Sequence, residues 1–229
     1  MSRLGALHFT KPTGTKHTAT VIFFHGSGDS GENMKEWVQI MARNFSFPHI
    51  KVMFPTAPLQ PYTPNGGAMS NVWFDRADIS INAPEKLDSL SKIEVEVKNL
   101  IQNENKAGIP SNRIIIGGFS MGGSLSFHAA YRWDANLAGV FVFSSFLNKD
   151  SIVYRELKDA SISSLPPLLQ CHGDNDGVVP LDWGQTTHKE LNSLGVPIQF
   201  HILERLGHQI NKRGLHLIRD FIEKQLPDV

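Results

Sequence analysis

The residues with the clearest capacity for chemistry form the pentapeptide Gly118-Phe119-Ser120-Met121-Gly122, at the end of the apolar run 114–116. A strand, a G-x-S-x-G turn and a helix, in that order, hold a serine hydroxyl on a sharp turn and present it to a substrate. The glycines fit this interpretation, because a Cβ two residues to either side of the serine would collide with the neighbouring strand and helix. The motif is short, and a glycine-rich turn without chemistry is the alternative. We predict Ser120 as a nucleophile.

A serine nucleophile needs a base that takes its proton and an acid that orients the base. Two acids, Asp174 and Asp176, follow the expected strand 168–171, and Asp176 is preferred because Asp174 stands in a pattern typical of local turn chemistry. Among the histidines, only His208 both follows these acids in the chain and lies in the loop between the last expected strand and the last expected helix. The predicted catalytic residues are therefore Ser120, Asp176 and His208, in the order serine, acid, base.

Acyl transfer also needs stabilisation of a developing oxyanion, and each backbone N–H aimed at it contributes about 2.7–4 kcal/mol. One donor is expected from Met121, directly after the nucleophile, and the other from the loop 25–29 after an earlier strand. We assign the second donor to the amide of Ser27, although a plain glycine turn is the alternative. This chemistry requires no metal and no organic cofactor.

The composition predicts one globular domain, 1–229. The chain has 229 residues, 41% hydrophobic residues and a formal net charge of +0, so no overall field favours nucleic acid. Its one cysteine, Cys171, lies in an apolar run and is interpreted as an inert core thiol in a reducing compartment. The sequence has no run of about twenty apolar residues, so no membrane-spanning helix is expected. The first residues lack a signal-peptide pattern. The expected location is cytoplasmic, and a homodimer is compatible with the sequence.

The elements that must position these residues alternate between strand-like and helix-like patterns. Such alternation predicts the α/β class, with a mainly parallel central sheet flanked by helices and no large lid domain. Strands are expected at 20–24, 50–54, 113–116, 138–143, 168–171 and 196–202. Helices are expected from Pro84 to about 107 and at 121–132, 182–194 and 215–226, and residues 37–44 are expected to form part of a helix.

One long segment, 55–83, shows no regular pattern. Loops of this length in compact domains are usually functional or disordered. The aromatic residues Tyr62, Trp73 and Phe74 favour an ordered segment. Trp73, Phe74 and residues of this loop are predicted to bind the substrate by lining an acyl pocket. Packing in the core is an equally good interpretation of the aromatic residues.

Motifs along nearly the whole chain resemble the acyl-protein thioesterase and lysophospholipase family of small serine hydrolases. They are, in family order, residues 25–29 (HGSGD), 55–58 (PTAP), Gly66-Gly67 with 73–75 (WFD), 117–123 (GGFSMGG), His172-Gly173 with 176–179 (DGVV), and Gly207-His208. The resemblance implies an α/β-hydrolase fold and a cytosolic enzyme that removes acyl chains from protein cysteines or lysophospholipids. It implies the same catalytic residues and the same two oxyanion amides as the pattern itself.

Two of these positions differ from the thioesterases proper, which usually carry Leu in place of Ser27 and Gln in place of Met121. The lysophospholipase-like branch of the family is similar to this chain at both positions, which implies a shallower site that favours short acyl esters. The predicted function is hydrolysis of acyl esters or thioesters, with an acylated small molecule or an S-acylated protein as substrate. The alternative is a catalytically idle hydrolase fold that acts as a binding or scaffold protein.

Overall fold

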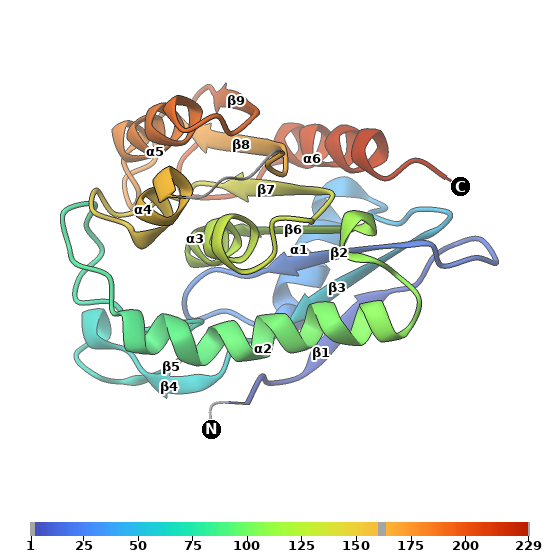
Figure 1. Ribbon diagram of the computed structural model, residues 1–229, viewed down its shortest axis with the longest axis horizontal. Coiled ribbons are helices and arrows are strands. Elements are labelled where there is room, and N and C mark those ends of the chain that lie inside the picture. The colour runs from blue at the N-terminus through green and yellow to red at the C-terminus, as the bar shows by residue number, and fades with distance from the viewer. Residues whose placement is uncertain (1–2, 160–163, 229) are drawn as a thin grey trace.

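A seven-stranded sheet forms the centre of the molecule, with strand order β1-β3-β2-β6-β7-β8-β9 (Figure 1). The computed structural model describes residues 3–159 and 164–228. Neighbouring strands of this sheet pair in parallel, except that β1 pairs antiparallel with β3 at one edge. The strands are β1 (Leu7–Thr10), β2 (Ala19–Phe24), β3 (Ile50–Pro55), β6 (Ile114–Phe119), β7 (Gly139–Phe143), β8 (Leu168–Gly173) and β9 (Ile198–Leu203).

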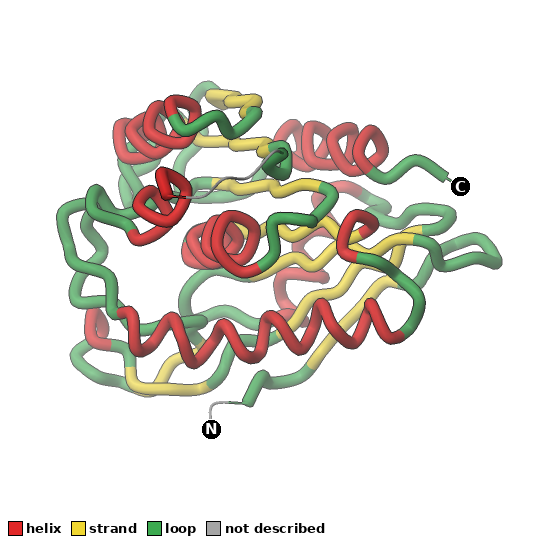
Figure 2. The backbone as a smooth tube through the Cα atoms, viewed as in Figure 1, coloured by secondary structure: helices red, strands yellow, loops and turns green. Residues whose placement is uncertain are grey.

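Helices cover both faces of the sheet (Figure 2). They are α1 (Gly31–Ala42), α2 (Leu87–Lys106), α3 (Met121–His128), α4 (Ile152–Asp159), α5 (Leu181–Ser193) and α6 (Lys212–Gln225). Because side chains alternate along a strand, β2 sends Ile22 and Phe24 to one buried cluster, with α2 to α5, and Val21 and Phe23 to the other, with α1 and α6. This three-layer arrangement confirms the predicted mainly parallel sheet flanked by helices, and the described elements include no lid domain.

The sheet topology gathers the predicted site residues at one edge. The loop with Ser27 follows β2, Ser120 follows β6, and Asp176 and His208 follow β8 and β9. These four strands run in parallel, so their carboxyl ends lie at the same edge of the sheet. Residues that are far apart in the chain therefore lie close together in the fold. In open α/β sheets, this edge, outside the carboxyl ends of the strands, is where ligands bind.

Several short elements depart from the expected pattern. β1 was not expected, and the segment 55–83 contains a small antiparallel hairpin of β4 (Leu59–Pro61) and β5 (Met69–Asn71) with a 3₁₀ turn between them. Helix α2 begins at Leu87 rather than at Pro84, and α3 passes at Ala129–Trp133 into a π-helical turn. The other expected strands and helices are present, with ends that differ by a few residues. The segment 37–44, expected as part of a helix, forms the second half of α1 as far as Ala42.

No described helix combines the length and the apolar character that a membrane span requires. We propose that the whole chain, 1–229, is one domain, because both buried clusters pack against the same sheet. Residues 1, 2, 160–163 and 229 of that range lie outside the described residues.

Candidate active site

Ser120 stands at a sharp turn between β6 and α3, in a backbone conformation that L-residues rarely adopt. Its φ is 53° and its ψ is −119°, a conformation that costs about 1–3 kcal/mol and persists only where the surroundings hold it. The amide of Ser120 donates a hydrogen bond of 2.9 Å to the carbonyl of Phe143 on the neighbouring strand. The turn thus fixes the serine backbone at the carboxyl edge of the sheet.

The positions two residues to either side of the serine leave no room for a side chain and therefore require glycine. A Cβ on Gly118 would lie 2.4 Å from the carbonyl carbon of Gly122, and a Cβ on Gly122 would lie 2.4 Å from the carbonyl oxygen of Phe24. Both distances are far below a van der Waals contact, and backbone atoms of a central strand cannot move aside easily. The close approach of strand, turn and helix explains the G-x-S-x-G pattern in physical terms.

We expect Gly122→Ala to lower the free energy of unfolding by about 1–3 kcal/mol, because the added methyl group overpacks the turn against β2. The measurement is urea denaturation monitored by circular dichroism. Gly177→Ala is the matched control, since a Cβ at Gly177 would meet no atom within 4 Å. Equal stability of the two variants would contradict this explanation of the motif.

The acid and base predicted from the sequence lie next to the serine. His208 Nδ1 lies 2.9 Å from Asp176 Oδ2, and His208 Nε2 lies 3.0 Å from Ser120 Oγ. The imidazole also packs on the ring of Phe119, with 4.8 Å between the centroids. Asp174, the competing acid, is exposed. The structure therefore joins one acid, one imidazole and one hydroxyl in a continuous hydrogen-bonded chain.

The carboxylate of Asp176 is buried and held from two further sides. Its Oδ1 accepts hydrogen bonds from the amides of Val178, at 3.0 Å, and Val179, at 2.8 Å. Burial acts to raise the pKa of Asp176, but the hydrogen bonds from His208 and from these two amides outweigh burial and hold the pKa below its ordinary value. Asp176 is thus an ionised, immobilised acceptor for the Nδ1–H of His208.

Both backbone amides predicted as oxyanion donors belong to residues of the cleft wall. Ser27 and Met121 line it together with Ser120, and neither amide donates a hydrogen bond to another described residue. The hydroxyl of Ser27 instead points to Met121 Sδ at 3.6 Å. Free N–H groups beside a serine hydroxyl are the arrangement that an oxyanion requires.

His25 shapes the loop that carries Ser27. Its Nε2 accepts a hydrogen bond of 3.0 Å from the amide of Ala57, and its Nδ1 lies 2.6 Å from the carbonyl oxygen of Gly26. Trp73 Nε1 donates to the carbonyl of His25 at 2.8 Å. Burial lowers the pKa of His25, against the opposing effects of Gly26 and Asp29, so the ring acts as a neutral structural group.

Around Ser120 lies a cleft of about 230 Å³. The two aromatic residues predicted to line it are not among its lining residues: Trp73 is 1% exposed and Phe74 is 6% exposed, and both belong to the core. Their packing there fits the alternative interpretation. The residues of the loop 55–83 that line the cleft are instead Tyr62, Arg76 and Ile79. Lining residues that were not predicted for the site include Ser124, Ser145, Phe146 and Val178.

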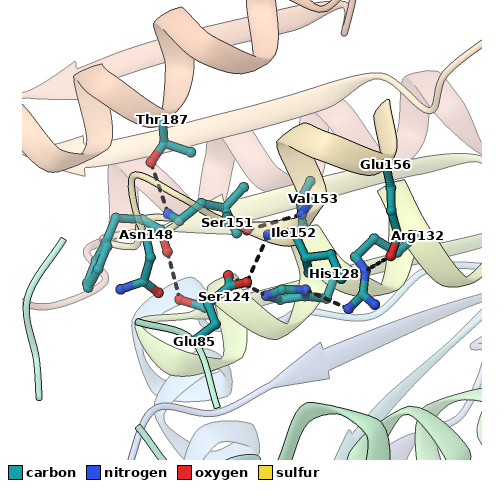
Figure 3. Close-up of polar contacts among 12 residues, drawn as sticks. Glu85, Ser124, His128, Arg132, Asn148, Ser151, Ile152, Val153, Glu156 and Thr187 are labelled. Carbon is teal, nitrogen blue, oxygen red and sulfur yellow. Dashed lines mark hydrogen bonds and ion pairs between the residues drawn. The ribbon is translucent and has the colours of Figure 1, made fainter. Parts of the chain in front are cut away.

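A buried polar network lies behind one wall of the cleft (Figure 3). Ser124 of α3 donates a hydrogen bond of 2.9 Å to the carbonyl of Phe146 and lies 3.1 Å from the hydroxyl of Ser145. In the same network, Glu85 lies 3.3 Å from His128 Nε2. These bonds tie Ser124 of α3 to the segment after β7 and hold this wall of the cleft in place.

A parallel sheet with a serine on a strained strand-to-helix turn defines the class of α/β-hydrolases. The chain belongs to the phospholipase/carboxylesterase family, whose sequence profile matches residues 7–226. Membership makes the protein a hydrolase and confirms the resemblance seen in the sequence to acyl-protein thioesterases and lysophospholipases.

Individual relatives agree with this assignment. Lysophospholipase-like protein 1 of Mus musculus is 48% identical over 217 residues, which are 94% of this chain and 90% of that protein. Acyl-protein thioesterase 1 homolog 1 of Dictyostelium discoideum is 35% identical and covers 93% of each chain. The crystal structure of Zea mays acyl-protein thioesterase 2 superimposes with a TM-score of 0.85 at 27% identity, over 97% of this chain and 99% of that one.

Proposed function

We propose that this protein is a serine carboxylesterase or thioesterase that cleaves acyl esters or thioesters through an acyl-enzyme on Ser120. The observation that supports this most is the hydrogen-bonded chain from Asp176 through His208 to Ser120 Oγ, with distances of 2.9 and 3.0 Å. Such a chain gives a weak nucleophile a base and fixes the orientation of that base. The substrate is an acylated small molecule or an S-acylated protein.

In the proposed mechanism, His208 Nε2 accepts the Ser120 proton while Oγ attacks the acyl carbonyl carbon. The carbonyl oxygen becomes an oxyanion, and the amides of Ser27 and Met121 donate hydrogen bonds to it. The imidazolium, stabilised by ionised Asp176, then protonates the leaving alcohol or thiol as the bond to the acyl carbon breaks. Water attacks the acyl-enzyme in the same way and releases the acid with Ser120 restored.

The size of the cleft favours short acyl groups. At about 230 Å³ it is smaller than the roughly 300–1,000 Å³ of sites that bury drug-sized ligands. The buried aromatic side chains of Trp73 and Phe74 do not extend it. We therefore propose that acetyl to hexanoyl esters are better substrates than palmitoyl esters.

We expect kcat/KM to be highest at short chains in a series of 4-nitrophenyl esters from acetyl to palmitoyl, because a long chain does not fit a cleft of about 230 Å³ with its carbonyl carbon at Ser120. The measurement is initial-rate hydrolysis, with Ser120→Ala as the background control. Matched oxoester and thioester substrates of one acyl length then separate the two reaction types. A maximum at palmitoyl would contradict the proposed substrate class and favour depalmitoylation.

A cytoplasmic location is part of this proposal. The one cysteine of the chain, Cys171, is buried in β8, and burial raises the pKa of its thiol to about 12. Such a thiol is an inert core group rather than a nucleophile. A chain with a single cysteine also forms no internal disulfide, which fits a reducing compartment.

A further inference from the structure

We propose that Arg76 and Tyr62 form a subsite for an anionic group of the substrate, so that the preferred esters carry a carboxylate or a phosphate close to the scissile bond. This inference rests on the proposed function and names the substrate class more closely. Both residues line the cleft that contains Ser120 and His208. Both belong to the loop 55–83, whose residues were predicted to line the pocket, but neither was singled out there as a binding residue.

Arg76 presents a half-buried cation without a hydrogen-bond partner. Its Nε is buried and unpaired, and no described acid lies within ion-pair distance of its guanidinium. The guanidinium lies over two aromatic rings, 5.1 Å from the centroid of Phe74 and 5.6 Å from that of Phe146. Aromatic faces hold the cation in position but leave its N–H donors free.

Of the two acids that influence Arg76, Glu85 is already paired with other groups. One carboxylate oxygen lies 3.3 Å from His128 Nε2, and the other accepts a hydrogen bond of 2.9 Å from the amide of Ile152 (Figure 3). Burial acts to raise the pKa of Glu85, but its interactions with His128, and hydrogen bonds, outweigh burial and lower it. Glu85 is therefore an ionised partner of His128 and not of Arg76.

The second acid, Asp75, faces a different cation. Its Oδ2 lies 2.6 Å from Lys86 Nζ and accepts a hydrogen bond of 2.6 Å from the hydroxyl of Thr63. Its Oδ1 accepts from the amide of Thr63 at 2.8 Å. These bonds hold the carboxylate away from the adjacent Arg76. Burial lowers the pKa of Arg76, while Tyr62, Glu85 and Asp75 oppose this effect at longer range.

Tyr62 supplies a second unpaired polar group in the same cleft. The side chain is buried, and its hydroxyl has no hydrogen-bond partner among the described residues. Ten buried side-chain atoms of the described residues lack a hydrogen-bond partner, and of these only Arg76 Nε and the Tyr62 hydroxyl belong to residues that line this cleft. Buried polar groups are nearly always paired, so both call for a partner. A ligand oxygen is the partner that satisfies both.

The chemistry of that ligand follows from the guanidinium. Arginine presents planar, charged N–H donors that match the oxygens of a carboxylate or a phosphate, and a tyrosine hydroxyl donates to the same oxygens. Asp29 is the acid among the lining residues, and its Oδ1 accepts from the Ser30 amide and from Asn33 at the start of α1 rather than from Arg76. Arg76 is therefore the charged group of the cleft wall whose donors remain open to a ligand. The anion belongs either to the acyl group or to the leaving alcohol.

Two substrate pairs test the proposal and distinguish these sources. The first compares 4-nitrophenyl hemiglutarate with 4-nitrophenyl valerate, and the second compares 1-butyrylglycerol 3-phosphate with 1-butyrylglycerol. We expect the wild-type protein to prefer the anionic member of one pair, as measured by kcat/KM. Arg76→Gln is expected to lower that preference about tenfold or more, since hydrogen bonds to charged groups are lost. Tyr62→Phe is expected to lower it by a smaller factor.

Arg219→Gln is the matched control, because Arg219 also lies over two phenylalanine rings, 5.4 Å from Phe45 and 4.6 Å from Phe47, outside the cleft wall. It is expected to leave the preference unchanged. No anionic preference in the wild type, or equal losses on both members of a pair in Arg76→Gln, would overturn the subsite. If Arg76→Gln does not fold, Tyr62→Phe takes its place in the test, and equal losses on both members of a pair in Tyr62→Phe would likewise overturn the subsite. A wild-type protein that hydrolyses neither member of either pair overturns the proposed function itself.

Discussion

Replacing Ser120 or His208 by alanine is expected to reduce kcat/KM for a short-chain ester by about 10⁴- to 10⁶-fold. Ser120→Ala removes the atom that bonds to the acyl carbon, and His208→Ala removes the base 3.0 Å from that atom. The measurement is steady-state hydrolysis with circular dichroism to verify folding. His216→Ala, an exposed histidine of α6, is the control and is expected to retain wild-type activity.

The double variant Ser120→Ala/His208→Ala gives a further test, because groups that act as one unit lose activity non-additively. It is expected to be no less active than either single variant. Activity that falls by the product of the two single effects would mean that the hydroxyl and the imidazole act independently. That result would contradict the proton transfer from Ser120 to His208.

Replacing Asp176 by asparagine is expected to reduce kcat/KM by about 10³- to 10⁴-fold, whereas Asp174→Asn is expected to change it by less than about threefold. An amide at position 176 removes the charge that stabilises the imidazolium and allows the wrong histidine tautomer. Asp174 is the matched control, because it lies on the same loop, is exposed, and has no side-chain contact with His208. Both rates are measured on the same short-chain ester.

The opposite pattern, a severe Asp174→Asn and a mild Asp176→Asn, would reassign the acid. Stability measurements keep the test sharp, since Asp176 also accepts hydrogen bonds from the amides of Val178 and Val179. If the variant has a melting temperature close to that of the wild type, its lower activity reflects the loss of the carboxylate and not unfolding of the loop that carries it.

The central elements were predictable because apolar periodicity is strong where an element is buried on one or both faces. The run 114–116 is fully buried in β6, and the helical spacing of Leu90, Ile93 and Val97 matches the buried face of α2. β1 was missed because its four residues are exposed or half-buried and show no apolar run. The strands β4 and β5 were missed because each has only three residues, and their hairpin is defined by pairing rather than by pattern.

Some features of the candidate site were predictable from the sequence and others were not. Chain order and position after strands were enough to select Ser120, Asp176 and His208, which the sheet then places at one edge. The roles of Trp73 and Phe74 were not predictable, because aromatic residues suit a core and a cleft equally well. The loop 55–83 was expected to line the pocket, but the particular role of Arg76 and Tyr62 was not predictable, because a polar group is seen to lack a partner only once its neighbours are in place.

The central claim is that Ser120 is a nucleophile activated by His208, and covalent labelling with a fluorophosphonate probe tests it most directly. Peptide mapping by mass spectrometry is expected to find one adduct, on Ser120, absent from Ser120→Ala and strongly reduced in His208→Ala. Absence of labelling in the wild-type protein, or equal labelling of Ser120→Ala, would contradict the claim. The first of these results would favour a catalytically idle hydrolase fold.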